Sequence, residues 1–187
     1  MFFLAAGLDV ADHVEEALVV YEACIETTRR YKDPTYVEAQ FNVANVYAKL
    51  GRVEEALDSR RYTCKLLQAS SNPVTKLTAA GNLATSLVQT KRYAECKDLC
   101  REQIAIAEQH GLGAHKAGIN LKDTLASALL EENKFCAEDL REALAILEAI
   151  VPMSRRLLGG AHPYTKRMEV TLTAARVRGT FLFPKEG

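Results

Sequence analysis

Apolar residues recur at the spacing of α-helices along most of the chain. The segment FNVANVYAKL, residues 41–50, carries apolar side chains on one helical face, and Gly51 follows where a helix tends to end in a residue that tolerates positive φ. The segment VEEALDSRRYTCKLL, residues 53–67, again separates apolar from charged positions, which is typical of an amphipathic helix. Two such helices joined by a short turn predict an antiparallel hairpin.

The hairpin pattern recurs several times. Small residues align near the middle of each expected first helix, at intervals of 39, 40, 42 and 47 residues: Ala5, Ala44, Ala84, Ala126 and Thr173. Nine residues after each of the first four, an apolar residue opens the expected second helix: Val14, Val53, Tyr93 and Phe135. Self-similarity of helix pairs at a few tens of residues predicts an all-α solenoid.

The expected domain covers residues 1–179, and a tail follows at 180–187. It holds about four repeats, the first and last incomplete, at approximately 1–32, 33–72, 73–114, 115–161 and 162–179. The first helix of repeat one is short, and the helix TKRMEVTLTAARVR has no second helix after it. Because solenoid repeats bury their faces on their neighbours, we expect self-association or packing through uncapped ends, or a segment of a longer protein. Phe181, Leu182 and Phe183 could fold back as a partial cap.

Glycine and histidine recur in the connections between repeats, as LGAHKAG at 112–118 and LLGGAHPYT at 157–165. Four connector residues precede an expected helix start, and we expect them to cap or pack against it: Asp33, Asn72, His115 and His162. The alternative is a phosphate cradle or a metal ligand. That alternative needs a preceding strand and a following Lys/Thr, or further ligands nearby, and the sequence offers neither.

These connectors and helix motifs resemble the tetratricopeptide repeats of the kinesin light chain type. Matching positions are Leu158, Gly159, His162, Pro163 and Thr165 in the connector, Asn42, Val43, Ala44, Asn82, Leu83 and Ala84 in the first helices, and Gly51, Val53 and Ala56 in the turn. The resemblance spans nearly the whole chain. It implies a right-handed superhelical solenoid that binds a peptide or helix of a partner in its concave groove, with Asn42 and Asn82 hydrogen-bonding the peptide backbone.

Several positions depart from that family pattern. Arg60 stands where an aromatic residue is usual, and Lys91 and Asn133 replace the turn glycine. Lys116 replaces the connector proline, and Thr124 and Thr171 replace asparagine. The fourth repeat is about one residue short around FCAEDLREAL, and its second helix then runs long before Gly159, so we expect a distortion there.

Polar residues on the outward face of the expected first helices form the candidate partner-binding groove. They are Glu38, Asn42, Asn45, Lys49, Asn82, Thr85, Gln89, Asn120, Asp123, Ser127, Glu131, Arg167 and Arg178. Amide side chains suit peptide recognition because each has both a donor and an acceptor. The alternative for each single position is a solvated polar residue on an amphipathic helix.

Composition argues against nucleic-acid and membrane partners. The 24 basic and 24 acidic residues cancel, so we expect no nucleic-acid partner, and the arginine pairs at 29–30, 60–61 and 155–156 are interleaved with acids. The apolar run MFFLAAGL is too short to span a membrane and lacks a basic leader, which favours a cytoplasmic protein with no membrane partner.

The five cysteines are odd in number and never spaced as CxxC, so we expect neither a disulfide framework nor a zinc site, and mostly buried, reduced thiols. An enzyme would recruit Cys96 or Cys100 as nucleophile with His110 or His115 as base, but burial of both cysteines is the better interpretation. We therefore expect a protein-interaction scaffold without catalytic site, cofactor or metal. The alternative is a regulatory or sensor segment of a larger signalling or motor-adaptor protein, without binding activity of its own.

Overall fold

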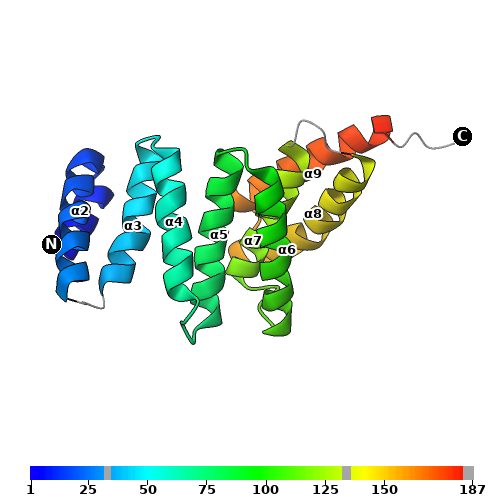
Figure 1. Cartoon of the computed structure of the whole chain (residues 1–187). Helices are drawn as coiled ribbons and strands as arrows, with labels where there is room; N and C mark the ends of the chain where they lie inside the picture. Colours follow the sequence, from blue (N-terminus) through cyan, green and yellow to red (C-terminus); the bar gives the residue numbers. More distant parts are fainter. Residues whose placement is uncertain (32–34, 132–135, 183–187) are drawn as a thin grey trace, which may run out of the picture. The chain divides into compact units, whose positions relative to one another are not determined.

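The computed structural model describes residues 1–31, 35–131 and 136–182, and every regular element in those ranges is an α-helix (Figure 1). Over these ranges the helices are α1 (Phe2–Val10), α2 (Val14–Tyr31), α3 (Thr35–Lys49), α4 (Val53–Leu67), α5 (Pro73–Gln89), α6 (Tyr93–Gln109), α7 (Lys116–Glu131), α8 (Ala137–Leu158) and α9 (Pro163–Leu182). The predicted all-α architecture is confirmed. Val14, Val53 and Tyr93 open α2, α4 and α6 as expected, while Phe135 lies outside the described residues.

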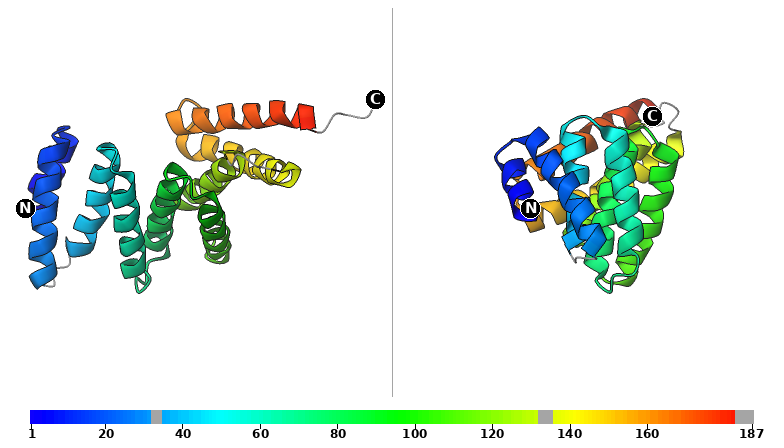
Figure 2. Two further views of the ribbon diagram at one scale, coloured as in Figure 1. Left: turned by 45° about the horizontal axis from the view of Figure 1, so that its top comes forward. Right: turned by 60° about the vertical axis from the view of Figure 1, so that its left-hand side comes forward.

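The chain forms two compact units, Met1–Thr90 with α1 to α5 and Lys91–Gly187 with α6 to α9. In the first unit each helix packs against the next one in sequence, and α1 also contacts α3 (Figure 2). In the second unit α7 packs on α6, α8 on α7 and α9 on α8. The expected repeat at 73–114 thus contributes α5 to the first unit and α6 to the second.

Small residues lie at the centre of the helix packing. The aligned alanines Ala5, Ala44, Ala84 and Ala126 are all fully buried. A methyl side chain lets neighbouring helices approach closely, which explains why these positions repeat along the sequence. Thr173 is different, because it is exposed on α9 while its neighbour Leu172 is buried. The alignment was therefore wrong at its last member, and Leu172 holds the packing position in α9.

Three turns between helices share one hydrogen-bond pattern. After α3, Gly51 has φ +73°, the Gly51 N–H donates to the Ala48 carbonyl at 3.1 Å, and the Arg52 N–H donates to the Tyr47 carbonyl at 2.9 Å. This is a Schellman motif, which satisfies carbonyls that the helix end leaves open. Equivalent bonds follow α1, where Asp12 takes the positive φ, and α6, where Gly111 does.

The connector residues cap the helices that follow them. Asn72 Oδ1 accepts the Val74 N–H at 2.9 Å, and the Nδ1 atoms of His115 and His162 accept the N–H two residues on, at 3.2 and 3.1 Å. The prediction of capping residues is confirmed at these three positions, and Asp33 lies outside the described residues. Histidine can take the place of the usual Asn or Asp because its Nδ1 is separated from its own backbone by the same number of bonds as their Oδ1.

The second helix of the fourth pair is long, as the sequence predicts. Helix α8 is 22 residues long, contains Pro152, and ends at Leu158, with Gly159 as its C-cap. Cys136 precedes its first residue, and the Cys136 N–H donates to Asp139 Oδ2 at 3.1 Å. Asn133 lies outside the described residues. Helix α9 continues to Leu182, so residues 180–182 of the expected tail belong to that helix.

Candidate functional site

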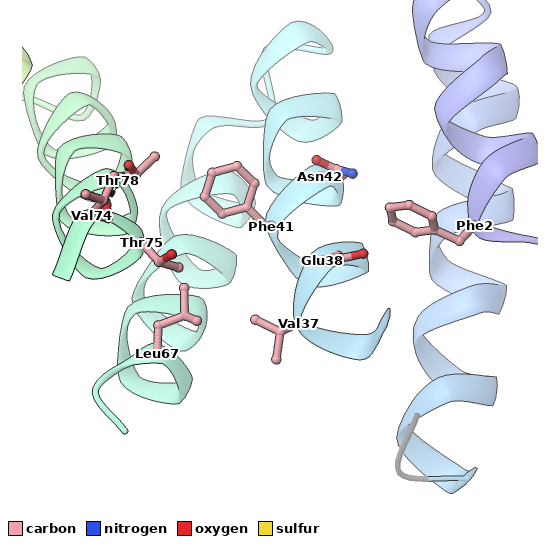
Figure 3. Close-up of a pocket in the computed structure, with 9 residues that line it drawn as sticks. All are labelled: Phe2, Val37, Glu38, Phe41, Asn42, Leu67, Val74, Thr75 and Thr78. Carbon is pink, nitrogen blue, oxygen red and sulfur yellow. Dashed lines mark hydrogen bonds between the residues drawn. The ribbon is translucent and has the colours of Figure 1, made fainter. Parts of the chain in front are cut away.

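A pocket of about 530 Å³ opens on the first unit, between α1, α3, α4 and α5 (Figure 3). Its apolar walls are Phe2 from α1, Val37 and Phe41 from α3, Leu67 from α4 and Val74 from α5. Its polar lining is Glu38, Asn42, Thr75 and Thr78. In Figure 3 the Phe2 ring points from α1 towards α3, and Phe41 extends from α3 towards α5. This volume and mixed lining suit one or two side chains of a bound ligand.

The lining on α3 follows from the register of that helix. Ala39, Val43 and Val46 are buried against the core of the unit, which leaves Glu38 and Asn42, one turn apart, on the open side. Both were predicted as groove residues, and the structure brings them together in the pocket. Phe41 belongs to the apolar pattern, yet it is only partly buried and also lines the pocket.

The opposite wall comes from the first turns of α5. Because Asn72 Oδ1 accepts the N–H of Val74 at 2.9 Å and of Thr75 at 3.4 Å, the cap fixes the residues that border the pocket. The Thr78 hydroxyl donates to the Val74 carbonyl at 2.8 Å, so its hydrogen is used within the helix. The α5 wall therefore consists of Val74 and two threonines, of which Thr78 is exposed.

Phe2 and Asn42 are held by a common neighbour, Tyr21 of α2. The rings of Phe2 and Tyr21 meet edge to face with centroids 6.1 Å apart. Burial raises the pKa of Tyr21, an effect that a hydrogen bond with Asn42 partly offsets. Tyr21 itself is 1% exposed, so the pocket wall and one of its polar groups rest on the buried core of the unit.

Asn45 lies one turn beyond Asn42 but is engaged within the protein. Arg60 of α4 extends between the helices: Nη2 donates to Asn45 Oδ1 at 3.2 Å, and Nη1 donates to Ser86 Oγ at 2.5 Å and to the Asn82 carbonyl at 3.2 Å. Arg60 thus joins α3, α4 and α5. Burial lowers its pKa, and its Nε has no hydrogen-bond partner among the described residues. The sequence shows that position 60 lacks the usual aromatic residue, but it does not predict the hydrogen bonds that Arg60 makes.

Three predicted groove residues meet in the second unit. Asp123 of α7, 3% exposed, forms an ion pair with Arg167 of α9, and the Tyr164 hydroxyl donates to Asn120 Oδ1 at 3.1 Å. The Arg167 guanidinium also lies over the Tyr164 ring, 5.0 Å from its centroid. Burial raises the pKa of Asp123, and the attraction of Arg167 opposes that rise. Burial likewise raises the pKa of Tyr164, a residue absent from the predicted groove.

The remaining predicted groove residues are scattered over both units. Lys49 pairs with Asp9 of α1 at 2.7 Å, which ties α3 to α1. The Thr85 hydroxyl donates to the Gly81 carbonyl at 2.9 Å, and Arg178 Nη1 donates to the Leu130 carbonyl at 3.2 Å. Gln89 and Glu131 are exposed, whereas Ser127 is half-buried. None of these six lines the 530 Å³ pocket.

The cysteines have different environments. Cys96 and Cys100 are fully buried on α6 with their Sγ atoms 3.9 Å apart, Cys24 is buried, and burial raises the pKa of Cys64 to about 11. Cys136 is exposed. Within the described ranges, no group of three or more His, Cys, Asp or Glu side chains is arranged to hold a metal ion. No helix in the same ranges combines the length and apolarity needed to cross a membrane.

Comparisons with solved structures identify the fold. The chain superposes on a putative kinesin light chain of Podosopora anserina with nearly identical TPR-like repeats, with TM-score 0.74, 20% identity, and coverage of 95% of this chain and 84% of that one. The match to BtubC of P. vanneervenii has TM-score 0.71, 17% identity and coverage of 88% and 66%. The apo form of RapI gives TM-score 0.82, 13% identity and coverage of 96% and 63%.

The chain has the tetratricopeptide-like repeat fold. No protein-family model matches its sequence, and no curated protein matches it either. The predicted likeness to kinesin light chain repeats is confirmed at the level of the fold by these neighbours. In the division into repeats predicted from the sequence, α1, α3 and α5 are the first helices of successive repeats, and each of them contributes residues to the pocket.

Proposed function

We propose that the first unit is a protein-interaction module that takes an apolar side chain of a partner peptide into the pocket between α1, α3 and α5. The tetratricopeptide-like fold is generally a protein-interaction scaffold, which supports this class of function. The observation that carries the proposal is the pocket itself. It combines partly exposed Phe2 and Phe41 with Glu38 and Asn42 at the predicted groove positions.

The chemistry of the lining defines the peptide we expect. Phe2, Phe41 and Leu67 favour a large apolar side chain, because burying one contributes roughly 1.5–3 kcal/mol. Asn42 has a donor and an acceptor suited to a peptide backbone. Glu38 is exposed and is the charged residue in the pocket lining, so a lysine or arginine beside the apolar residue is favoured.

The second unit contributes less to this function. Asn120, Asp123 and Arg167, which the sequence predicts as groove residues, already bind one another or Tyr164. A ligand there would have to replace these internal contacts, and breaking the ion pair with Arg167 would leave the buried Asp123 carboxylate without a partner. We therefore assign peptide binding to the first unit, and a structural role to the cluster in the second.

A peptide selection tests the proposal. A random peptide library is displayed against the full chain, and the recovered peptides are tested on Thr78→Arg, which places a long side chain at the exposed edge of the pocket. Thr27→Arg is the matched control, since Thr27 is also exposed and its hydroxyl also donates to the carbonyl four residues earlier, at 2.8 Å. We expect peptides with an apolar and a basic residue, which lose binding to Thr78→Arg only. Peptides that bind both variants equally would contradict the assignment.

A further inference from the structure

Helix α1 carries an apolar face turned away from the core of its unit. Phe3 and Val10 are each 87% exposed, whereas Ala5 on the opposite side of the helix is fully buried. Seven residues separate Phe3 from Val10, which puts them on one stripe about 10 Å apart. Gly7 lies between them, and an added Cβ there would meet no atom within 4 Å. The stripe therefore exposes two apolar side chains to solvent, with a glycine between them.

The first turn of the neighbouring helix α2 adds negative charge. Glu15 and Glu16 are exposed there, and Val19 in the next turn is 66% exposed, whereas Glu22 lies on the α3 side and accepts a hydrogen bond from the Tyr47 hydroxyl at 2.9 Å. Residues 1–31 contain six acidic residues, Asp9, Asp12, Glu15, Glu16, Glu22 and Glu26, and two basic ones, Arg29 and Arg30, in the last turn of α2. The free face of α1 and α2, defined by Phe3, Val10 and Val19, is thus apolar and belongs to a segment with an excess of acidic residues.

Helix α9 has the complementary character. Thr165, Met168, Leu172 and Ala175 are buried on one side, while Val170 and Val177, 69% and 53% exposed, lie on the other. These two valines are also seven residues apart, and the small residues Thr173 and Ala174 lie between them, exposed. The free face of α9, defined by Val170 and Val177, therefore repeats the spacing found in Phe3 and Val10.

The charge around the free face of α9 is opposite in sign. Residues 152–182 contain six basic residues, Arg155, Arg156, Lys166, Arg167, Arg176 and Arg178, and one acidic residue, Glu169. Ion pairs with Asp123 and Glu148 leave the Arg167 and Arg176 side chains 54% and 59% exposed. The two ends of a chain with zero net charge thus have opposite charges around apolar stripes of equal spacing.

We propose that the occupant of each face is a second copy of this chain, with the free face of α1 and α2 of one copy packing on the free face of α9 of the next. The apolar stripes supply contact area, and the opposite charges select this pairing over a symmetric one, in which like charges would meet. Such a contact joins two different surfaces, so it extends into head-to-tail oligomers unless the geometry closes a ring. This inference does not depend on the peptide pocket.

Sedimentation velocity of the full chain, with no residue added before Met1, tests the inference. At 50 mM salt we expect the weight-average mass to rise with concentration from 20.6 kDa past twice that value, and 0.5 M salt to reduce it. Val10→Arg blocks the α1 and α2 face, Val177→Glu blocks the α9 face, and each variant alone is expected to stay monomeric. Ala105→Arg, at an exposed position of α6, is the control and should associate as the wild type does.

Mixing the two blocked variants is the decisive step. Each retains the face that the other lacks, so an equimolar mixture should form a dimer that grows no further. A wild-type chain that is monomeric at every concentration would overturn the inference, as would a dimer that reaches a plateau and is not restored by mixing. Val19→Arg and Val170→Glu form a second pair of variants for use if either first variant loses its helical circular dichroism.

Discussion

Arg60 on α4 donates a hydrogen bond to Asn45 on α3, with 3.2 Å between Nη2 and Oδ1. Asn45, a residue expected to face a ligand, is thus part of the packing that Arg60 makes between α3, α4 and α5. Arg60 also places a guanidinium where the family pattern has an aromatic ring, at a site that lowers the pKa of Arg60 through burial.

The cost of burying Arg60 leads to the first prediction. Arg60→Met keeps an unbranched apolar stem and removes a guanidinium group whose Nε is unpaired among the described residues. Because a buried charge that lacks a carboxylate partner is expensive, we expect a change in the free energy of unfolding between zero and a gain of about 2 kcal/mol. Urea denaturation measures it, and a loss above about 2 kcal/mol would show that the three hydrogen bonds outweigh the cost of burial.

The repeat pattern predicted the helices well because each packing rule leaves a mark in the sequence. Buried alanines recur where helices approach, apolar residues open the second helices, and Asn72, His115 and His162 cap the helices that follow. These are local effects with short sequence signatures.

The candidate site was predicted only in part. Glu38 and Asn42 follow from helical register, and both line the pocket. The partial exposure of Phe41 depends on the space between α3 and α5, which periodicity cannot measure. The partners of Arg60 and Asp123 could not be predicted either. A long side chain selects its contacts in three dimensions, and Arg167 is 44 residues away from Asp123 in sequence.

Lys91 offers a test of the turn geometry. It has φ +58°, a left-handed conformation that costs a residue with a side chain about 1–2 kcal/mol, while Gly51 and Gly111 take equivalent values freely. We expect Lys91→Gly to stabilise the chain by about 0.5–1 kcal/mol, which is less than the strain it removes because glycine has more freedom to lose on folding. The reciprocal Gly51→Lys should destabilise the chain by about 1 kcal/mol. Thermal denaturation measures both variants. Equal melting temperatures for both variants would contradict this account.

Gly118 lies where the loop after α6 comes close to helix α7. A Cβ at this position would overlap the Leu112 carbonyl oxygen, which is backbone and cannot move aside as a side chain can. We expect Gly118→Ala to cost about 1–3 kcal/mol, the range for inserted atoms in a packed interior. Gly7→Ala is the control, because its Cβ has open space and alanine favours the helix. An equal effect of the two substitutions on the urea midpoint would refute the steric argument.

Asp123 predicts a pH dependence with a definite sign. Burial raises the pKa of this carboxyl above its usual 3.8, so between about pH 4 and the raised value the folded chain holds a proton that the unfolded chain has lost. The stability that Asp123 contributes is complete below about pH 4 and is lost as the pH rises through the folded-state pKa. Relative to Asp123→Asn, the wild type should therefore lose stability in urea denaturation as the pH rises above about 4. A relative gain over this range would mean that the Arg167 ion pair dominates.

Glu38 determines the charge preference of the proposed peptide. We expect Glu38→Lys to weaken a selected peptide with a basic residue beside its apolar anchor by about tenfold at low salt, with a smaller effect at 0.5 M salt. Replacing the basic residue of that peptide by glutamate should restore part of the affinity. Fluorescence anisotropy measures the four combinations, and purely additive effects would place the peptide's charge away from Glu38.

The central claim is that the pocket binds the partner peptide, and Phe41→Ala tests this claim most directly. The affinity of one selected peptide is measured by isothermal titration for this variant and for Tyr31→Ala, which removes a comparably large ring that is 74% exposed and outside the pocket. Both variants are first checked for wild-type helical circular dichroism, and all chains are titrated at a concentration at which they are monomeric. We predict that Phe41→Ala weakens binding by about 10- to 100-fold, as expected for a lost apolar contact, and that Tyr31→Ala leaves it unchanged. Equal affinities for Phe41→Ala and the wild-type chain would contradict the claim.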